Sequence, residues 1–292
     1  MYEVLIPRVL EAFARPDEAE QDFLRRVQAS DVRLQQQYRT QRRVGSEIYA
    51  DPMIRAAYLL RYLGHYTLQL GDVLTGLDGN PEAAAVLSQP HLQATALCGG
   101  PGPELIALAA LHAQLGGSSL ALSVLDHNAR HWADCWPIAQ AIANTYPRHP
   151  AVSIQGLATE LLAPAVSPWE RELLQQTQVM TAMNCLNELV GHGRARLETA
   201  LRQRLDALPA GALVLASDQA FYGACEAGIQ LLHALLVERG ARILLADITK
   251  AQCHSVANRF QVPGRIAWIY GAEQNNRFRV HVQQLRLAAR MP

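Results

Sequence analysis

The sequence predicts an α/β protein with an open, mostly parallel sheet that follows an all-helical N-terminal region. From residue 94 onward, short apolar runs typical of strands alternate with helical runs, and repeated strand–helix–strand units force parallel strands. Before about residue 90 the pattern is helical only. We therefore expect residues 1–90 to form a helical region and residues 91–292 to form the sheet domain.

Two kinds of helix are expected in the N-terminal region. Residues 18–44 are polar and rich in Gln and Arg, with apolar residues at mixed spacings of three and four, which predicts surface helices. Residues 51–77 differ, because Asp51 can cap a helix, Pro52 suits its first turn, and the run stays apolar until Gly71. This second segment is expected to be a mostly buried helix.

The sheet domain is expected to alternate strands and helices and to end in an antiparallel hairpin. Helices are expected at residues 103–116 and 129–146. Strands are expected at residues 94–98, 119–126, 151–156, 177–183, 211–218 and 241–248, and the hairpin at residues 265–271 and 277–285.

Charge and composition limit the kinds of partner. Lys plus Arg number 26 and Asp plus Glu number 26, so the chain has no electrostatic footprint for nucleic acid or for an anionic membrane. This balance disfavours nucleic acid without excluding it. Half of the residues are apolar, which is enough for a sizeable core. A small molecule is the expected partner, and a homodimer is left open.

Cysteine usage and the N-terminus indicate the compartment. The five cysteines are widely spaced without a C-x-x-C pair, which disfavours both a disulfide framework and a zinc knuckle. The N-terminus has neither a basic segment nor a long apolar one, and no stretch stays apolar for the roughly 20 residues of a membrane span. We expect a soluble, cytoplasmic protein without a membrane partner.

Residues 96–108 read ALCGGPGPELIAL and place a glycine turn between the first strand and a helix. In an open parallel sheet, ligands lie at the carboxyl ends of the strands. Gly100 and Gly102 lack Cβ atoms that would block a ligand, and the helix start offers free backbone N–H groups. Leu105 stands where a dinucleotide-binding motif has its third glycine, and Glu104 would repel a pyrophosphate. A cofactor that carries an amine or a sulfonium suits this turn better.

Asp126 ends the second strand about twenty residues after the turn, where a carboxylate can accept hydrogen bonds from both ribose hydroxyls of an adenosine. With LCGGPGPE as the glycine-rich motif and VLD as the ribose-binding acid, roughly residues 94–292 resemble the class I S-adenosylmethionine-dependent methyltransferases. The resemblance implies a Rossmann-like, seven-stranded, mostly parallel sheet with an antiparallel last strand. It also implies S-adenosyl-L-methionine as the cofactor.

The resemblance also implies where the cofactor lies. It places the cofactor over the glycine turn and the adenine near the end of the third strand, and His127 is a candidate to lie beside the ribose or adenine. The contacts expected on this basis are Gly99, Gly100, Pro101, Gly102, Glu104, Asp126, His127, Gln155, Gly156 and Leu157.

Residues 126–135 contain residue types that bind metals, because His127 and His131 lie four residues apart with Asp134 and Cys135 nearby. Asp126 is already assigned to the ribose, and no second cluster supplies a fourth ligand. We therefore expect no metal, and we expect Trp132 and Trp136 to be core residues.

The segment after the fourth strand, TAMNCLNELVGHG, faces the transferred methyl group in this family. Relatives that methylate amines of bases or glutamine often carry an Asn/Asp-Pro-Pro-aromatic motif there, and this chain lacks the prolines. Asn184, Asn187 and Glu188 can still orient an amine or take its proton. Alternatively, Asn184 caps the next helix and Glu188 occupies its first turn. Asn184 and Glu188 are catalytic candidates, Asn184 is also a cofactor candidate, and Asn187 is a substrate candidate.

A loop after the fifth strand would face the same cleft. It carries Asp218, Phe221 and Tyr222, which are candidates for substrate binding. A helix cap by Asp218 would explain part of this pattern.

Three tyrosines, Tyr58, Tyr62 and Tyr66, recur every four residues and form a helical stripe. Most aromatic stripes are core, but buried hydroxyls need partners, and a cleft supplies them more readily than a core. In methyltransferases the segment before the first strand folds over the cofactor as a lid. We expect Tyr58 to be a catalytic candidate, with Arg61 and Tyr62 as cofactor contacts; the alternative is packing on the outer helices.

Three functions follow from the resemblance. The first is methylation of a small molecule at nitrogen or oxygen. The second is a ribosomal RNA or protein methyltransferase or assembly factor. AAYLLRYLGHY resembles a helix of ribosome-associated, mitochondrial-type methyltransferase-like proteins, and Arg39, Arg42 and Arg43 form a local basic run. The third is a non-catalytic S-adenosylmethionine binder or an aminocarboxypropyl transferase, whose cofactor site would look the same.

Overall fold

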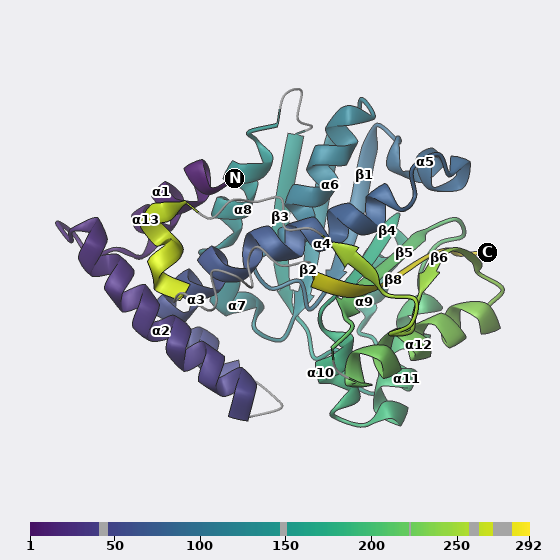
Figure 1. The fold of residues 1–292 in the computed structure, drawn as a ribbon. Coiled ribbons are helices and arrows are strands. Elements are labelled where there is room, and N and C mark those ends of the chain that lie inside the picture. Colours follow the sequence, from purple (N-terminus) through teal and green to yellow (C-terminus); the bar gives the residue numbers. More distant parts are fainter. Residues whose placement is uncertain (41–45, 147–150, 222, 257–262, 271–281) are drawn as a thin grey trace.

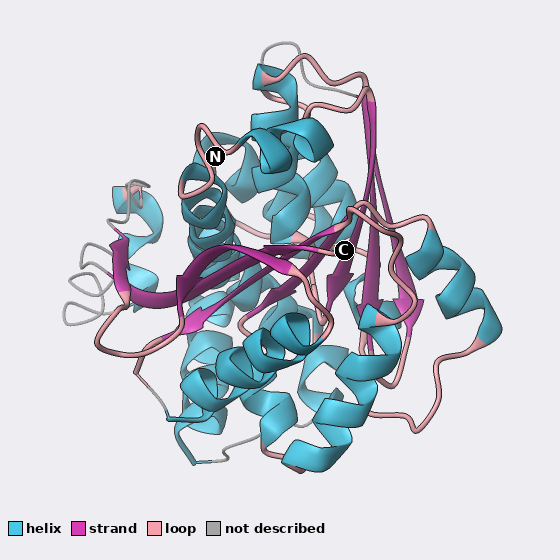
Figure 2. Cartoon of the chain, turned by 90° about the vertical axis from the view of Figure 1, so that its right-hand side faces the viewer, coloured by secondary structure: helices cyan, strands magenta, loops and turns pink. Residues whose placement is uncertain are grey.

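The computed structural model describes residues 1–40, 46–146, 151–221, 223–256, 263–270 and 282–292. These residues form a twisted sheet with helices against both of its faces (Figure 1, Figure 2). The elements before the sheet are α1 (Tyr2–Phe13), α2 (Glu20–Thr40), the 3-10 turn η1 (Ser46–Ala50), α3 (Pro52–Tyr58), the π-helical turn η2 (Leu59–Leu63), α4 (Gly64–Thr75) and α5 (Pro81–Leu87).

Within the described residues the sheet has eight strands in the order β3-β2-β1-β4-β5-β8-β6, and β7 pairs with β8. The pairs among β1 to β5 are parallel, whereas β8 runs antiparallel to β5, β6 and β7. This confirms the predicted fold class, with one short strand more than the seven expected. The strands are β1 (His91–Leu97), β2 (Ser119–Asp126), β3 (Ala151–Ala158), β4 (Val179–Met183), β5 (Leu213–Gln219), β6 (Arg242–Asp247), β7 (His254–Val256) and β8 (Val282–Arg290).

The first half of the expected terminal hairpin is wrong. Residues 264–270 are helical, and β7 takes the place beside β8 that the hairpin prediction gave them. Ile266 and Ile269 are both buried, and their spacing of three places them on one side of a helical turn. Of the second half, residues 282–285 belong to β8, and residues 277–281 lie outside the described residues.

The remaining helices complete three apolar clusters. They are α6 (Pro103–Gln114), α7 (Ala129–Trp132), α8 (Trp136–Ala143), α9 (Pro168–Gln175), α10 (Leu186–Val190), α11 (Arg194–Leu205), α12 (Gly223–Glu238), α13 (Gly264–Ala267) and the 3-10 turn η3 (Trp268–Tyr270). Apolar side chains of α9 to α12 form one cluster with the sheet, and those of α4, α5 and α6 form another with it. The third cluster joins α1, α2 and α3 to α6, α7 and α8.

The N-terminal helices therefore share their cores with the sheet domain. Phe23, Val27 and Leu34 of α2 are fully buried, because their spacings of four and seven residues place them on one helical face. The expected surface helix thus has a buried face as well. The last N-terminal helix ends at Leu87 and β1 begins at His91, close to the expected boundary. A division into two separate domains stays a prediction.

Asp51 caps α3 as predicted, since its Oδ1 accepts a hydrogen bond from the Met53 N–H at 2.9 Å. We expect Asp51→Ala to lower the free energy of unfolding by ~1 kcal/mol, because this N–H loses its acceptor. Asp51→Asn keeps an acceptor oxygen and loses the charge that pairs with the exposed Arg33, so it should cost clearly less. Urea unfolding measures both, and equal losses would assign the effect to the ion pair instead.

Candidate functional site

The glycine turn joins β1 to α6 beside the point where the strand order reverses. Cys98, Gly100 and Gly102 have φ values of 52°, 50° and 79°, in the left-handed region that favours glycine. A Cβ on Gly102 would lie 2.4 Å from Cδ1 of Ile154, so a side chain fits there only if the Ile154 side chain shifts. The turn is closed by a hydrogen bond from the Gly102 N–H to the Gly99 carbonyl at 2.8 Å.

Asp126 braces this turn from the end of β2. Its Oδ2 accepts a hydrogen bond from the Gly100 N–H at 3.0 Å, and its Oδ1 accepts one from the Asn128 N–H at 2.6 Å. Burial raises the pKa of this carboxyl, and the two backbone donors oppose the rise. Because a carboxylate offers about four lone-pair positions, these two bonds leave acceptors for two further donors.

Two tryptophans cover the turn. The Trp132 ring lies 3.6 Å from the place that a Cβ on Gly100 would take, and Trp132 is core, as expected. Trp136 donates its Nε1–H to the Gly100 carbonyl at 3.0 Å, and its ring fills the space beside Gly156. An adenine can therefore reach Gly156 only if this indole moves. The adenine contacts predicted at Gln155, Gly156 and Leu157 stay predictions.

Glu104 is buried beneath the turn, with 2% of its surface exposed. Its Oε2 lies 3.4 Å from the place that a Cβ on Gly99 would take and accepts no hydrogen bond from the described residues. Burial raises the pKa of Glu104 to about 8, and the charge of Asp126 adds to the rise. At neutral pH this carboxyl is therefore mostly protonated.

Asn184 follows β4 with a left-handed φ of 53°, and its Nδ2 donates to Gln69 Oε1 of α4 at 2.5 Å. The alternative that Asn184 caps α10 is wrong, because Cys185 is the N-cap residue of that helix. Gln69 is fully buried, and its Nε2 and the Asn184 Oδ1 have no hydrogen-bond partner among the described residues. One buried donor and one buried acceptor of this hydrogen-bonded amide pair thus remain without a partner among the described residues. No pattern in the sequence singles out Gln69.

Glu188 lies in the first turn of α10, as the alternative reading expected. Burial raises its pKa to about 7, and the negative charges of Asp218 and Asp126 add to the rise. Burial likewise raises the pKa of Asp218 to about 6, although it accepts hydrogen bonds from the Gln219 and Asn187 N–H groups. Glu188 can therefore exchange a proton near neutral pH.

The predicted tyrosine stripe is continuous. Ring centroids are 5.0 Å apart between Tyr58 and Tyr62, and 5.4 Å apart between Tyr62 and Tyr66. Tyr58 also lies 5.1 Å from Trp132, the ring that covers the glycine turn. Farther along this helix, the Thr67 hydroxyl donates to the Pro103 carbonyl at 3.4 Å. The helix therefore lies over the carboxyl edge of the sheet.

Other candidates point elsewhere. Arg61 forms a buried ion pair with Asp31 at 2.6 Å, and the Tyr62 hydroxyl accepts a hydrogen bond from Gln35 at 2.7 Å. The predicted cofactor contacts of Arg61 and Tyr62 have no further support. His127 is exposed, with its Nδ1 3.7 Å from Glu160, and Phe221 is also exposed. Tyr222, Arg42 and Arg43 lie outside the described residues, as does the side chain of Arg39.

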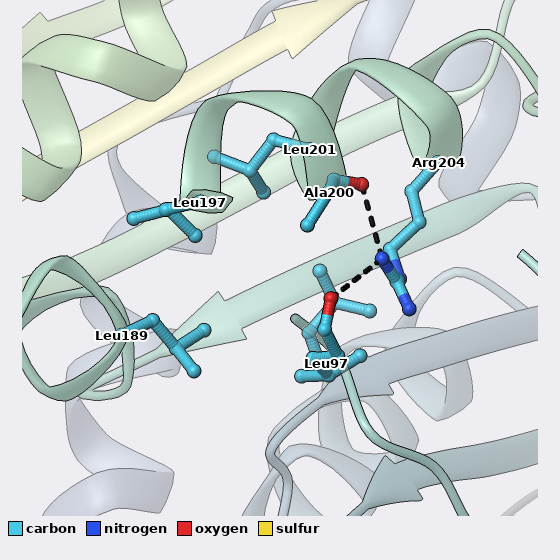
Figure 3. A pocket seen from close by; sticks show the side chains of 7 residues that line it. Leu97, Leu189, Leu197, Ala200, Leu201 and Arg204 are labelled. Carbon is cyan, nitrogen blue, oxygen red and sulfur yellow. Dashed lines mark hydrogen bonds between the residues drawn. The ribbon is translucent and has the colours of Figure 1, made fainter. Parts of the chain in front are cut away.

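A small apolar hollow lies against α11, on the other face of the sheet from α4 (Figure 3). Arg204 borders it and donates to the Leu161 and Ala200 carbonyls at 2.8 and 3.0 Å. The other residues around it are aliphatic, so it offers no reactive group beyond this arginine. They are Leu97, Leu161, Leu189, Leu197, Ala200 and Leu201.

In the part of the chain that the structure describes, no three His, Cys, Asp or Glu side chains are grouped to hold a metal ion. No described helix combines the length and apolar character needed to cross a membrane. All five cysteines are free thiols.

The crowding at Gly102 gives a test with a matched control. Gly79 has nearly the same φ, 76° against 79°, but a Cβ there would meet nothing within 4 Å. We expect Gly79→Ala to cost ~1–2 kcal/mol of unfolding free energy through backbone strain alone. Gly102→Ala should cost a further ~1–3 kcal/mol because of the contact with Ile154. Equal losses in urea unfolding would contradict the tight packing described for the turn.

The raised pKa of Glu104 gives a test in pH. With a folded pKa of about 8 against an ordinary value of 4.5, the folded state holds a proton that the unfolded state releases. Its contribution to stability is therefore complete below about pH 4.5 and is lost as the pH rises through about 8. The unfolding free energy of the wild type should therefore fall between pH 5 and 9, with Glu104 contributing at most ~5 kcal/mol to the fall. We expect Glu104→Gln to remove this contribution.

Denaturant unfolding across this pH range makes the measurement. Glu172→Gln, at an exposed carboxylate of α9, is the control and should leave the slope unchanged. A wild-type slope retained by Glu104→Gln would show that Glu104 titrates normally.

No protein-family profile and no curated protein sequence matches this chain. Solved structures similar to it include TehB from Haemophilus influenzae, with 11% identity over 76% of this chain and 62% of that chain and a TM-score of 0.43. Another is the CMeT domain of the citrinin polyketide synthase, with 13% identity over 68% of this chain and 46% of that chain and a TM-score of 0.36. A third is the N-methyltransferase NodS from Bradyrhizobium japonicum WM9 in complex with S-adenosyl-L-homocysteine, with 13% identity, 74% and 90% coverage and a TM-score of 0.39.

The chain thus spans less than two thirds of the first two proteins, and at these identities and TM-scores the similarity adds no argument about activity. The similarity in fold rests on the strand directions. The strands β1 to β5 are parallel and β8 is antiparallel, which is the arrangement that the resemblance of the sequence implies. In fold, the chain is similar to the class I S-adenosylmethionine-dependent methyltransferases.

Proposed function

We propose that this protein binds S-adenosylmethionine at the glycine turn and transfers its methyl group to the nitrogen or oxygen of a small molecule. The observation that carries the proposal is the Asp126 carboxylate, which is fixed by two backbone N–H groups and keeps two acceptor positions at the end of β2. Two vicinal ribose hydroxyls are the donors that suit such a carboxylate.

The neighbouring residues suit the other parts of the cofactor. Gly100 and Gly102 keep side chains away from the turn, so that a ligand can approach the backbone. The unpartnered donor of Gln69 and the unpartnered acceptor of Asn184 suit the carboxylate and the ammonium of an amino acid. When bound, S-adenosylmethionine supplies an electrophilic methyl group on its sulfonium.

The protein's own residues would then shield and assist the transfer. Tyr58 and Trp132 lie between the turn and the solvent side of the N-terminal helices, so they exclude water. Glu188, with a pKa of about 7, can accept the proton that the acceptor loses. This gives Glu188 the role of general base, and Asn184 the role of a cofactor contact.

The alternatives differ in acceptor or in product. The carboxyl groups of Asp126, Glu188 and Asp218 at this edge of the sheet disfavour a phosphate backbone near the reacting atoms, which speaks against RNA as the acceptor. An aminocarboxypropyl transferase would leave methylthioadenosine, whereas a methyltransferase leaves S-adenosylhomocysteine. Mass spectrometry of the spent cofactor after incubation with a metabolite extract separates these two, and a non-catalytic binder would leave neither.

We expect Asp126→Asn to weaken the binding of both S-adenosylmethionine and S-adenosylhomocysteine at least tenfold. The reason is the loss of charge-assisted hydrogen bonds of roughly 1.5–3 kcal/mol each. Isothermal titration calorimetry measures both affinities. The asparagine variant is preferred to alanine, because it keeps one acceptor oxygen, whereas alanine would leave both the Gly100 and the Asn128 N–H groups without an acceptor.

Glu172→Gln again serves as the surface control and should bind both ligands as the wild type does. If neither ligand binds the wild type while NAD(H) or ATP does, the proposed cofactor is wrong. Wild-type affinity in a folded Asp126→Asn variant would place the ribose elsewhere.

A further inference from the structure

A closed ring of hydrogen bonds, which we call the polar ring, joins Gln69, Asn184, Ser217 and Gln284. The Asn184 Nδ2 donates to Gln69 Oε1 at 2.5 Å, and the Asn184 backbone N–H donates to the Ser217 carbonyl at 2.8 Å. The Ser217 hydroxyl donates to Gln284 Oε1 at 3.3 Å, and Gln284 Nε2 makes a long hydrogen bond of 3.5 Å to the Gln69 carbonyl. The ring thus ties α4 to β5 and β8 at the end of β4.

Asp72 ties α4 to β8 a second time, close to Gln69 on the same helix. Its Oδ2 accepts hydrogen bonds from Gln284 Nε2 at 2.8 Å and from Arg286 Nη1 at 2.9 Å. Arg286 also pairs with Asp247 at the end of β6, at 2.5 Å. Gln284 and Arg286 are two residues apart in β8 and therefore point to the same face of the sheet. The strand β8 thus fixes where Gln69 lies over the sheet.

The polar ring is buried and has an open side. Gln69, Ser217 and Gln284 have no exposed surface. Both side-chain polar atoms of Gln284 have partners, whereas Gln69 Nε2 and Asn184 Oδ1 have none among the described residues. Satisfied buried hydrogen bonds add little net stability, and unpartnered buried groups cost it. A ligand that supplies one acceptor and one donor would complete the ring.

The open side lies at the edge of the sheet that carries the glycine turn. Asn184 follows β4, the turn follows β1, and these two strands are parallel neighbours. Asn184 has a φ of 53°, a left-handed conformation that asparagine adopts more readily than most residues. The ring holds both its backbone N–H and its side chain in this conformation. The open donor and acceptor are therefore held in place by the protein itself.

We propose that Gln284 is a positioning residue for the amino-acid end of the cofactor and acts through the amide pair of Gln69 and Asn184. This inference rests on the proposed function and identifies what holds that part of the site. The carboxylate of the cofactor would accept from Gln69 Nε2, and its ammonium would donate to Asn184 Oδ1. The distant strand β8 then contributes to cofactor affinity without touching the cofactor.

S-adenosylhomocysteine and 5′-methylthioadenosine test the proposal, because both contain the adenosine and the thioether and only the first has the amino-acid end. Methionine keeps the length of a glutamine side chain and removes its hydrogen bonds. We expect Gln69→Met and Gln284→Met each to weaken the binding of S-adenosylhomocysteine about tenfold in calorimetric titration, and to change the binding of methylthioadenosine by less than about twofold. A merely structural role would affect both ligands alike.

A matched control and a double variant sharpen the test. Gln178→Met breaks a similar amide pair, with Gln89, at the opposite edge of the sheet and should leave both affinities unchanged. The double variant of Gln69→Met and Gln284→Met should bind S-adenosylhomocysteine as Gln69→Met alone does, because Gln284 acts through Gln69. This comparison uses S-adenosylhomocysteine only, so it decides even where methylthioadenosine binds too weakly to measure.

Urea unfolding of each variant confirms that it is folded. Ser217→Ala removes only the hydroxyl that Gln284 accepts from, and it replaces Gln284→Met if that variant does not fold. Equal losses for both ligands, additive losses in the double variant, or wild-type affinity in a folded Gln284→Met variant would overturn the inference. In each of these cases the wild type still binds S-adenosylhomocysteine, and the proposed function stands. If the wild type binds neither ligand, the proposed function fails and the inference fails with it.

Discussion

The hydrogen bond from the Gly100 N–H to the Asp126 carboxylate fixes the backbone on which the whole site is built. Left-handed conformations at Cys98, Gly100 and Gly102 are costly for most residues, and they persist only where the surroundings hold them. Here β2 holds them through Asp126, and the indole of Trp136 holds them through the Gly100 carbonyl. Side chains of the protein itself therefore hold the turn in this conformation, and such preorganisation reduces the entropy that binding must overcome.

The same edge of the sheet gathers four carboxyl groups, those of Glu104, Asp126, Glu188 and Asp218. Burial raises the pKa values of Glu104, Asp126, Glu188 and Asp218. The negative charge of Asp126 raises the pKa values of Glu104 and Glu188 further. Desolvated carboxyl groups of this kind either hold a proton or acquire a cationic partner. A sulfonium and an ammonium supply that charge from the ligand side.

The alternation of strands and helices, the glycine turn, the place of Asp126 at the end of β2 and the Asp51 cap could be predicted, because each depends on a local pattern of apolar residues, glycine or capping groups. The first half of the terminal hairpin is mispredicted because residues 266–270 form one continuous apolar run, and a short apolar run fits a strand as well as a helix. Gln69 and Tyr49 could not be found, since their importance comes from contacts with Asn184 and Trp132, which are distant in sequence. Trp136 was expected in the core and instead lies over the predicted adenine site.

The N-terminal helix limits which of its own groups can meet a ligand. Arg61 and the Tyr62 hydroxyl are both bound to residues of α2, so α2 fixes the orientation of the π-helical turn η2 between α3 and α4. Such π-helical turns are frequent at functional sites. With Arg61 and Tyr62 held in this way, the groups left to face the site are the rings of Tyr58 and Tyr66. Arg61, a predicted cofactor contact, instead pairs with Asp31 of α2 and lies over the Tyr62 ring, so it holds this helix against α2.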